Sequence, residues 1–292
     1  MSGWGWAAVG LALLSAALTA VASAVQQRSA AAVPDGQAGG LRLLRQLLRS
    51  RWWWTGTLAD SGGYLAQAAA LGLGSLVLVQ PLLVTTVLFA LPLGARWSRR
   101  RLSRSDWAWA GVLVLALAVF MVTGEPTAGE DLAGWRSWLP AWGVLGAVVA
   151  ACLVGAAVRR GTPRAVLLAV TTGVAYGLGA ALTKGVVSLL DDGPAAVLGS
   201  WSTYLLVVVL AGGTLVQQSA YQAGPLEASL PAATVGEPVV AVALGLTVLG
   251  ERVQADGAEW LLIAVLTVAM GAATVALARS SAVPVRAPVP RS

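Results

Sequence analysis

The sequence of 292 residues contains no histidine and a single cysteine, Cys152. Without histidine, the chain has no imidazole general base, no Ser-His-Asp triad and no histidine-ligated metal site. One cysteine can form neither an intrachain disulfide nor a thiolate zinc site. Because no loop combines a nucleophile with a base, we expect neither an enzyme nor a bound metal or cofactor.

Charge is also scarce in this chain. Charged residues make up 11% of it and hydrophobic residues 57%, whereas soluble domains average about 25% and roughly 45–50%. The mean hydropathy is +0.76. A soluble fold could not bury so much apolar surface, so the sequence predicts an all-α integral membrane protein. The net charge of +6 does not indicate a nucleic-acid partner, because the arginines lie between apolar runs.

Nine stretches are apolar over about the 20 residues that a helix needs to cross a bilayer. They run over Trp4–Val25, Trp52–Leu71, Ser75–Ala95, Trp107–Thr123, Leu139–Val158, Ala165–Leu190, Ala195–Gln218, Leu226–Leu249 and Trp260–Ala278. The 13 tryptophans fall near the ends of these stretches, where an amphipathic ring prefers the headgroup zone. We therefore predict nine spans.

The loop charges orient these spans. Of the 19 lysines and arginines, 16 fall on the side opposite the N-terminus, whereas Arg136 and Arg252 fall on the N-terminal side and Lys184 lies within a span. Basic residues collect on the cytoplasmic side of membrane proteins. The sequence therefore predicts a multi-pass protein of the plasma (inner) membrane, with the N-terminus outside and the C-terminus in the cytoplasm.

Two segments outside the spans have their own patterns. In Leu41–Arg51 the arginines share one helical face, which fits either a short helix on the cytoplasmic leaflet or a solvated basic loop. Residues 280–292 are rich in proline and predict a disordered cytoplasmic tail.

The two halves of the chain resemble each other. A shift of 150 residues places Gly62-Gly63 on Gly212-Gly213, Gln67 on Gln217, Gly74 on Gly224, Pro81 on Pro231 and Asp106 on Asp256. Spans 1–4 and spans 6–9 are then repeats of opposite orientation, joined by span 5. We divide the chain into a first repeat (1–123), a linker with span 5 (124–163), a second repeat (164–279) and the tail (280–292). Inverted repeats are typical of secondary transporters.

The paired blocks from Gly62 to Asp106 and from Gly212 to Asp256 resemble the drug/metabolite transporter (DMT) superfamily, EamA-like group. Each block has a polar helix end, a glycine turn and a helix that opens near a proline. The second block reaches Leu249-Gly250-Glu251, which is similar to the "LGE" stretch of that superfamily, whereas the first reads Gly94-Ala95-Arg96. The resemblance implies ten spans with both termini cytoplasmic. Nine spans with an outside N-terminus are more similar to the NIPA-type magnesium transporter branch.

Asp60 lies near the middle of the second span, with Tyr64 and Gln67 at i+4 and i+7 on the same helical face. An ionisable side chain at the bilayer centre costs about 2.5–3.5 kcal/mol on insertion scales and commonly marks a functional site. We expect Asp60 to bind a proton or a cation in a polar cavity. The alternative is a carboxylate satisfied by neighbouring helices.

Glu237 lies at the middle of the eighth span and precedes Pro238. Proline has no N–H for the carbonyl of Thr234, four residues back. A carboxylate, that carbonyl and the Thr234 hydroxyl are therefore expected close together near the midplane, where transporters commonly bind ions or substrates. The alternative is a kink that turns Glu237 into a polar crevice.

Lys184 lies about six residues from the outer end of its span, or ~9 Å. It is a countercharge for Asp60 or Glu237, an anchor for an anionic substrate, or a lysine that snorkels to the headgroups. Tyr176 precedes it on the same face. Gln217, the repeat mate of Gln67, belongs to a polar stripe of the seventh span, and the two glutamines would hydrogen-bond a substrate or each other.

These groups predict a transporter that exports or exchanges a small metabolite or drug-like solute by alternating access, coupled to a proton or a cation. Its partners would be a small molecule or ion and the lipid bilayer, and a homodimer is compatible with the sequence. Two alternatives are a magnesium or other divalent-cation transporter, which needs oxygen ligands, and a membrane assembly or lipid-binding protein that transports nothing.

Overall fold

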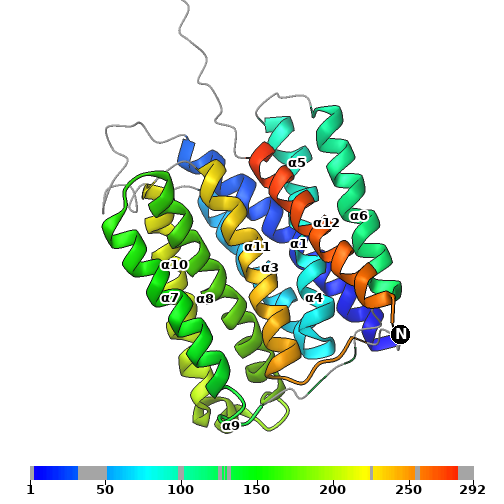
Figure 1. The fold of residues 1–292 in the computed structure, drawn as a ribbon, viewed down its shortest axis with the longest axis vertical. Coiled ribbons are helices and arrows are strands. Elements are labelled where there is room, and N and C mark those ends of the chain that lie inside the picture. The colour runs from blue at the N-terminus through cyan, green and yellow to red at the C-terminus, as the bar shows by residue number, and fades with distance from the viewer. Residues whose placement is uncertain are drawn as a thin grey trace, which may run out of the picture.

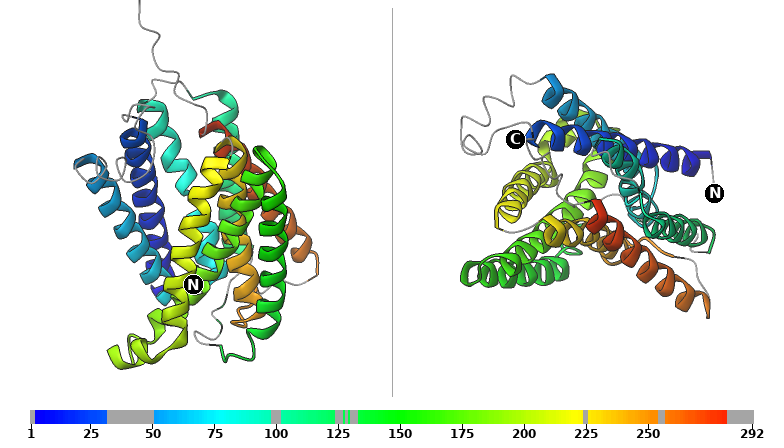
Figure 2. Two further views of the ribbon diagram at one scale, coloured as in Figure 1. Left: turned by 90° about the vertical axis from the view of Figure 1, so that its left-hand side faces the viewer. Right: turned by 90° about the horizontal axis from the view of Figure 1, so that it is seen from above.

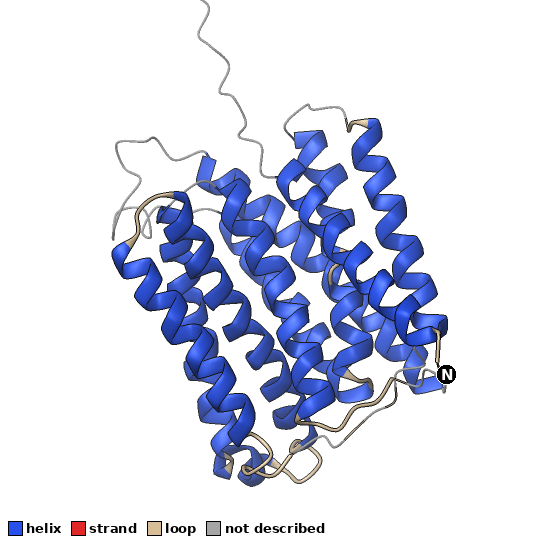
Figure 3. Ribbon diagram, in the orientation of Figure 1, coloured by secondary structure: helices blue, strands red, loops and turns tan. Residues whose placement is uncertain are grey.

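The computed structural model describes residues 3–31, 51–97, 102–123, 133–223, 226–253 and 257–281, together with Thr127 and Gly129. Most of these residues are helical (Figure 3). The helices are α1 (Gly3–Ala31), α3 (Arg51–Leu73), α4 (Leu76–Leu83), α5 (Thr86–Trp97), α6 (Arg104–Thr123), α7 (Leu139–Val158), α8 (Thr162–Ser188), α9 (Pro194–Gly199), α10 (Trp201–Ala223), α11 (Leu226–Thr247) and α12 (Glu259–Ser281). The predicted features of residues 41–50 and 282–292 lie outside the described residues.

Six helical segments of the described chain are long and apolar enough to cross a membrane. They are Gly5–Ala22, Leu76–Leu93, Arg104–Thr123, Leu139–Val158, Thr162–Ser188 and Glu259–Ser280. Shorter apolar helices lie at Trp201–Gln217 and Pro231–Thr247. The chain is therefore an all-α multi-pass membrane protein, whereas the count of nine spans stays a prediction.

Two predicted spans are divided into separate helices. Ser75–Ala95 becomes α4 and α5, which meet at a turn over Val84 and Thr85. At this turn the Thr85 Oγ1 donates to the carbonyl of Leu82 at 2.6 Å, and the Thr86 Oγ1 donates to that of Leu83 at 2.7 Å. These side chains satisfy carbonyls that a continuous helix would pair with backbone N–H groups.

The predicted span Ala195–Gln218 begins with the separate short helix α9. Ser200 has an extended backbone, with φ −85° and ψ 133°, and so ends α9. The Thr203 Oγ1 donates to the carbonyl of Val197 at 2.6 Å, and the Tyr204 hydroxyl donates to that of Leu198 at 2.7 Å. Side-chain donors thus replace the backbone donors of the missing turn, and the long helix α10 starts six residues later than predicted.

The helices form one elongated bundle. α1 packs along α3, α8 packs against both α10 and α11, and α6 packs along α12; Figure 2 shows α1 beside α3 and α6 beside α12. α7 lies on the outside of the bundle against α8 (Figure 1). The buried core runs through the middle of this bundle and holds apolar side chains from both halves of the chain, among them Leu71, Leu113, Leu182 and Leu277.

The bundle has two ends with different contacts. We call end A the end at which α7, α10 and α12 begin, at the bottom of Figure 1, and end B the opposite end. At end A, the Thr127 N–H donates to the Arg252 carbonyl at 2.9 Å and joins the loops that follow α6 and α11. At end B, the Asp106 carboxylate accepts from the Ser103 N–H at 2.8 Å and from the Ser280 hydroxyl at 2.5 Å. The start of α6 is thereby tied to the end of α12.

Candidate functional site

The helices α8 and α11 cross with their backbones in contact. A Cβ atom added at Gly177 would lie 2.6 Å from the carbonyl oxygen of Glu237 and 3.0 Å from the N of Ala241. One turn away, a Cβ atom at Gly173 would lie 2.9 Å from the Cα of Gly236. The two backbones therefore touch, and this crossing fixes the position of Glu237 against α8.

Tyr176 stands between these two glycines and links α8 to α10. Its hydroxyl donates to the Gln217 Oε1 at 3.1 Å and lies 3.2 Å from the Thr214 Oγ1. A Cβ atom at Gly213 would lie 3.0 Å from the Tyr176 ring, so α10 approaches this ring closely. Tyr176 and Gln217, both predicted as site residues, are thus brought together.

Two carboxylates from different halves of the chain lie within electrostatic range of Tyr176. Asp60 of α3 and Glu237 of α11 both lie close enough for their charges to act on its hydroxyl. Asp60 is exposed and Glu237 is half-buried. Neither carboxylate accepts a hydrogen bond from any residue that the structure describes. The arrangement therefore offers two acceptors that a proton, a cation or a donor group of a solute could satisfy.

Tyr64 connects the first half of the chain to α8. Its hydroxyl lies 2.9 Å from the Thr183 Oγ1, which itself lies 2.7 Å from the Gly179 carbonyl. Because Thr183 has one hydroxyl proton, which it donates to Gly179, Tyr64 donates to Thr183. Asp60 and Gln67 lie one turn before and one turn after Tyr64 on α3, and the three side chains are all at least partly exposed.

Thr234 and Glu237 lie on an unbroken helix, because α11 continues through Pro238 from Leu226 to Thr247. The visible break in helical structure is at Val84 and Thr85 instead. With the shift of 150 residues, Val84 corresponds to Thr234. At these corresponding positions the first half has a turn and the second half a continuous helix.

Lys184 is buried, with 1% of its surface exposed. Its Nζ donates to the Oε1 of Glu251 at 2.7 Å. The same carboxylate accepts from the backbone N–H groups of Leu76 at 2.8 Å and Val77 at 2.9 Å, the first residues of α4. The structure thus pairs Lys184 with Glu251, a residue that the sequence placed in an outer loop. The sequence contained a signal for this pairing. Glu251 belongs to the Leu-Gly-Glu stretch, and it lies on the same predicted side of the membrane as the nearer end of the helix that carries Lys184.

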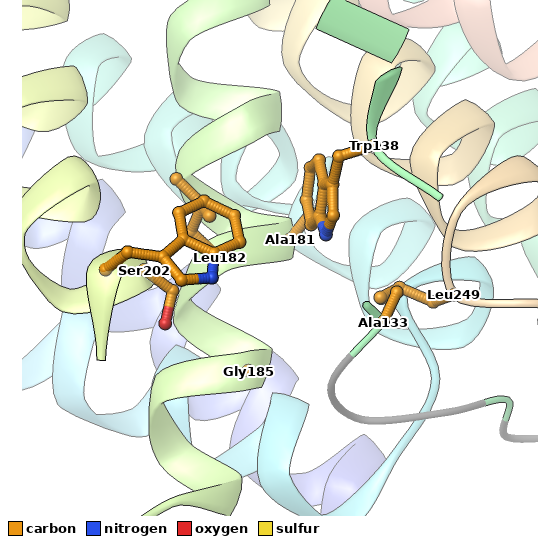
Figure 4. A pocket seen from close by; sticks show the side chains of 8 residues that line it. Ala133, Trp138, Ala181, Leu182, Gly185, Ser202 and Leu249 are labelled. Carbon is orange, nitrogen blue, oxygen red and sulfur yellow. The ribbon is translucent and has the colours of Figure 1, made fainter. Parts of the chain in front are cut away.

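The described residues contain no group of three His, Cys, Asp or Glu side chains placed to hold a metal ion. A small cavity of about 10 Å³ lies at end A, lined by Ala133, Trp138, Ala181, Leu182, Gly185, Trp201, Ser202 and Leu249 (Figure 4). This volume holds about one water molecule, so the cavity is too small for an organic solute. We take as the candidate site Tyr176 with Gln217 and the two carboxylates Asp60 and Glu237, and call this set the polar cluster. Tyr64 and Gln67 lie on α3 with Asp60.

Comparison with known proteins finds a full-length relative. The chain is 36% identical over 279 residues to an uncharacterized protein of Corynebacterium glutamicum. The aligned region covers 95% of this chain and 96% of the relative. The chain belongs to the family of that protein. Family membership extends over both halves of the chain, so it takes in the helices of the polar cluster as well as α7. No family model and no solved structure matches the chain.

Proposed function

We propose that this member of the family is a secondary transporter of the DMT/EamA type, which exports or exchanges a small metabolite or drug-like solute by alternating access. The observation that supports the proposal best is that the charges of Asp60 and Glu237 both act on Tyr176. One carboxylate comes from each half of the chain, and no described residue donates a hydrogen bond to either. A proton or cation bound there would be held by both halves at once, as coupling by a rocking motion requires.

The packing of the two halves agrees with an inverted repeat. α1 packs along α3 as α8 packs along α10, while α7, which has no mate in the repeat, lies outside against α8. In our proposal the chain crosses the membrane nine times, and α4 with α5 forms one crossing. The two halves rock against each other about the polar cluster, which opens in turn to end A and to end B.

We further propose that end A faces outward and end B faces the cytoplasm. Among the described residues, Arg136 and Arg252 lie at end A, and eight arginines lie at end B: Arg28, Arg51, Arg96, Arg104, Arg159, Arg160, Arg164 and Arg279. In a variant without Cys152, a cysteine at the exposed Ser137 should react with an impermeant thiol reagent on intact cells. A cysteine at the exposed Arg160 should react only after the membrane is opened. The reverse pattern would overturn the orientation.

A thermal-stability screen of the purified protein tests the proposed function directly. The panel contains amino acids, nucleosides, organic cations and magnesium, each at several pH values. A ligand that binds only the folded state at 100 times its dissociation constant adds about 2.7 kcal/mol to the stability, which raises the unfolding temperature measurably. We expect one organic class to raise it.

The other results of the screen separate the alternatives. Stabilisation by magnesium alone would favour a divalent-cation transporter, for which Asp60 and Glu237 with neighbouring hydroxyl and amide oxygens would supply ligands. Stabilisation by no compound of the panel would contradict the transporter proposal and favour an assembly or lipid-binding protein.

A further inference from the structure

Glu251 forms a three-way buried junction at end A. Its carboxylate is 2% exposed and accepts three hydrogen bonds, from Lys184 at 2.7 Å, Leu76 at 2.8 Å and Val77 at 2.9 Å. We call this set of contacts the Glu251 clamp. It satisfies two of the N–H groups that every helix start leaves unpaired, and it places a negative charge at the positive end of the α4 dipole.

The Glu251 clamp joins the two halves of the chain. α4 belongs to the first half, whereas Lys184 on α8 and Glu251 after α11 belong to the second. Lys184 directly follows Thr183, the residue that receives the Tyr64 hydroxyl. The clamp therefore lies next to the Tyr64–Thr183 contact, one residue closer to end A along α8.

Two further contacts close end A around the clamp. The Thr127–Arg252 bridge uses the residue that follows Glu251. The rings of Trp138, Trp142 and Trp201 pack against one another, with centroids 5.4 to 6.4 Å apart. Figure 4 shows Ala181 beside Trp138 in the lining of the small cavity. Lys184 and Ala181 are each 1% exposed, so the described residues cover both side chains at this end of the bundle.

Stability alone does not explain a buried ion pair at this place. Taking both charges out of water costs several kcal/mol per ion, and apolar replacements of such pairs are often equally stable or more stable. An ion pair differs from apolar packing in what happens when it breaks. If Glu251 leaves, Lys184 and the N–H groups of Leu76 and Val77 all lose this acceptor at once, and water can take its place. The clamp therefore favours two states, one dry and closed and one hydrated and open.

We propose that the Glu251 clamp is the gate of end A, which must break for the polar cluster to open to that side. This proposal rests on the proposed transport function, since alternating access needs a closure at each end. Glu251 and Lys184 act in it as positioning residues that set the balance of closed and open states, and they make no contact with the solute.

The test measures access to a buried reporter and needs no knowledge of the solute. In a variant with Cys152→Ala and Ala181→Cys, the thiol at position 181 is buried beside Trp138. It should therefore react slowly with a hydrophilic thiol reagent. The protein is held in lipid nanodiscs, where the reagent reaches both faces, and the reaction is followed by the mass increase. Adding Glu251→Gln should accelerate labelling about tenfold or more, because the closed state loses its charge-assisted contacts.

Two further variants keep the test decisive. Arg252→Gln changes an exposed side chain next to Glu251 and keeps the Thr127–Arg252 bridge, which uses the backbone of Arg252, so it should leave the labelling rate unchanged. Glu251→Asp keeps the charge but is one methylene too short to hold all three donors, so its rate should lie between those of the parent and Glu251→Gln. Glu251→Asp carries the test if Glu251→Gln does not elute as a single folded species. Parental rates in both Glu251 variants would overturn the gate. A negative ligand screen with faster labelling would instead contradict the transport proposal alone.

Discussion

Replacement of Glu237 by glutamine is expected to stop solute exchange while leaving the protein folded and inserted. The amide has nearly the shape of the carboxylate but cannot ionise. No described residue donates a hydrogen bond to Glu237, so the change leaves no partner unsatisfied, and a neutral amide costs less to bury than a charge. A lost charge-assisted contact of about 1.5–3 kcal/mol would weaken solute binding roughly 10- to 100-fold. If Glu237 also carries the coupling ion, exchange ceases.

The measurement is uptake of the ligand class found in the stability screen into proteoliposomes. The matched control is Asp192→Asn, which neutralises an exposed carboxylate in the turn between α8 and α9. The control should exchange solute at the parental rate, and both variants should match the parent in their elution from gel filtration. Full exchange by Glu237→Gln would remove Glu237 from the mechanism. Loss of exchange in both variants would point to a general effect of surface charge instead.

The sequence predicts helix positions well because a membrane leaves few choices. Each backbone polar group in the bilayer must be paired within its own segment, so a long apolar run becomes a helix. The stretches Leu139–Val158 and Leu226–Leu249 coincide with α7 and α11 almost to the residue. The turn at Val84 and Thr85 was not predicted, because its carbonyls are satisfied by the hydroxyls of Thr85 and Thr86. Threonine in an apolar run is equally compatible with a continuous helix.

For the candidate site, too, the sequence predicts the spacing of residues along one helix but not the contacts between helices. Helical spacing correctly puts Asp60, Tyr64 and Gln67 in register along α3. It cannot say which helix they meet, and the contact of Tyr64 with Thr183 depends on how α3 packs against α8. The partner of Lys184 lies 67 residues away in the chain. The helical periodicity of the sequence does not predict this ion pair. Two opposite charges predicted on the same side of the membrane could, however, have indicated it.

Replacement of Gly177 by alanine is expected to destabilise the protein and to move Glu237. The added methyl group would meet backbone atoms of α11, the Glu237 oxygen at 2.6 Å and the Ala241 nitrogen at 3.0 Å. Backbone cannot rotate away as a side chain can, so α8 and α11 must separate. Overpacking of this kind costs about 1–3 kcal/mol and occasionally more. The separation also draws the carboxylate of Glu237 away from Tyr176, so ligand affinity should fall together with stability.

Gly146→Ala on α7 provides a control with the opposite expected sign. A Cβ atom there has no other atom within 4 Å, and alanine is favoured over glycine in a helix by about 1 kcal/mol. Unfolding temperatures in one detergent should therefore fall for Gly177→Ala and stay level or rise for Gly146→Ala. Equal unfolding temperatures in the two variants would mean that α8 and α11 do not touch at Gly177. The crossing could then not be what holds Glu237 beside Tyr176, and the geometry on which the proposed site depends would have to be replaced.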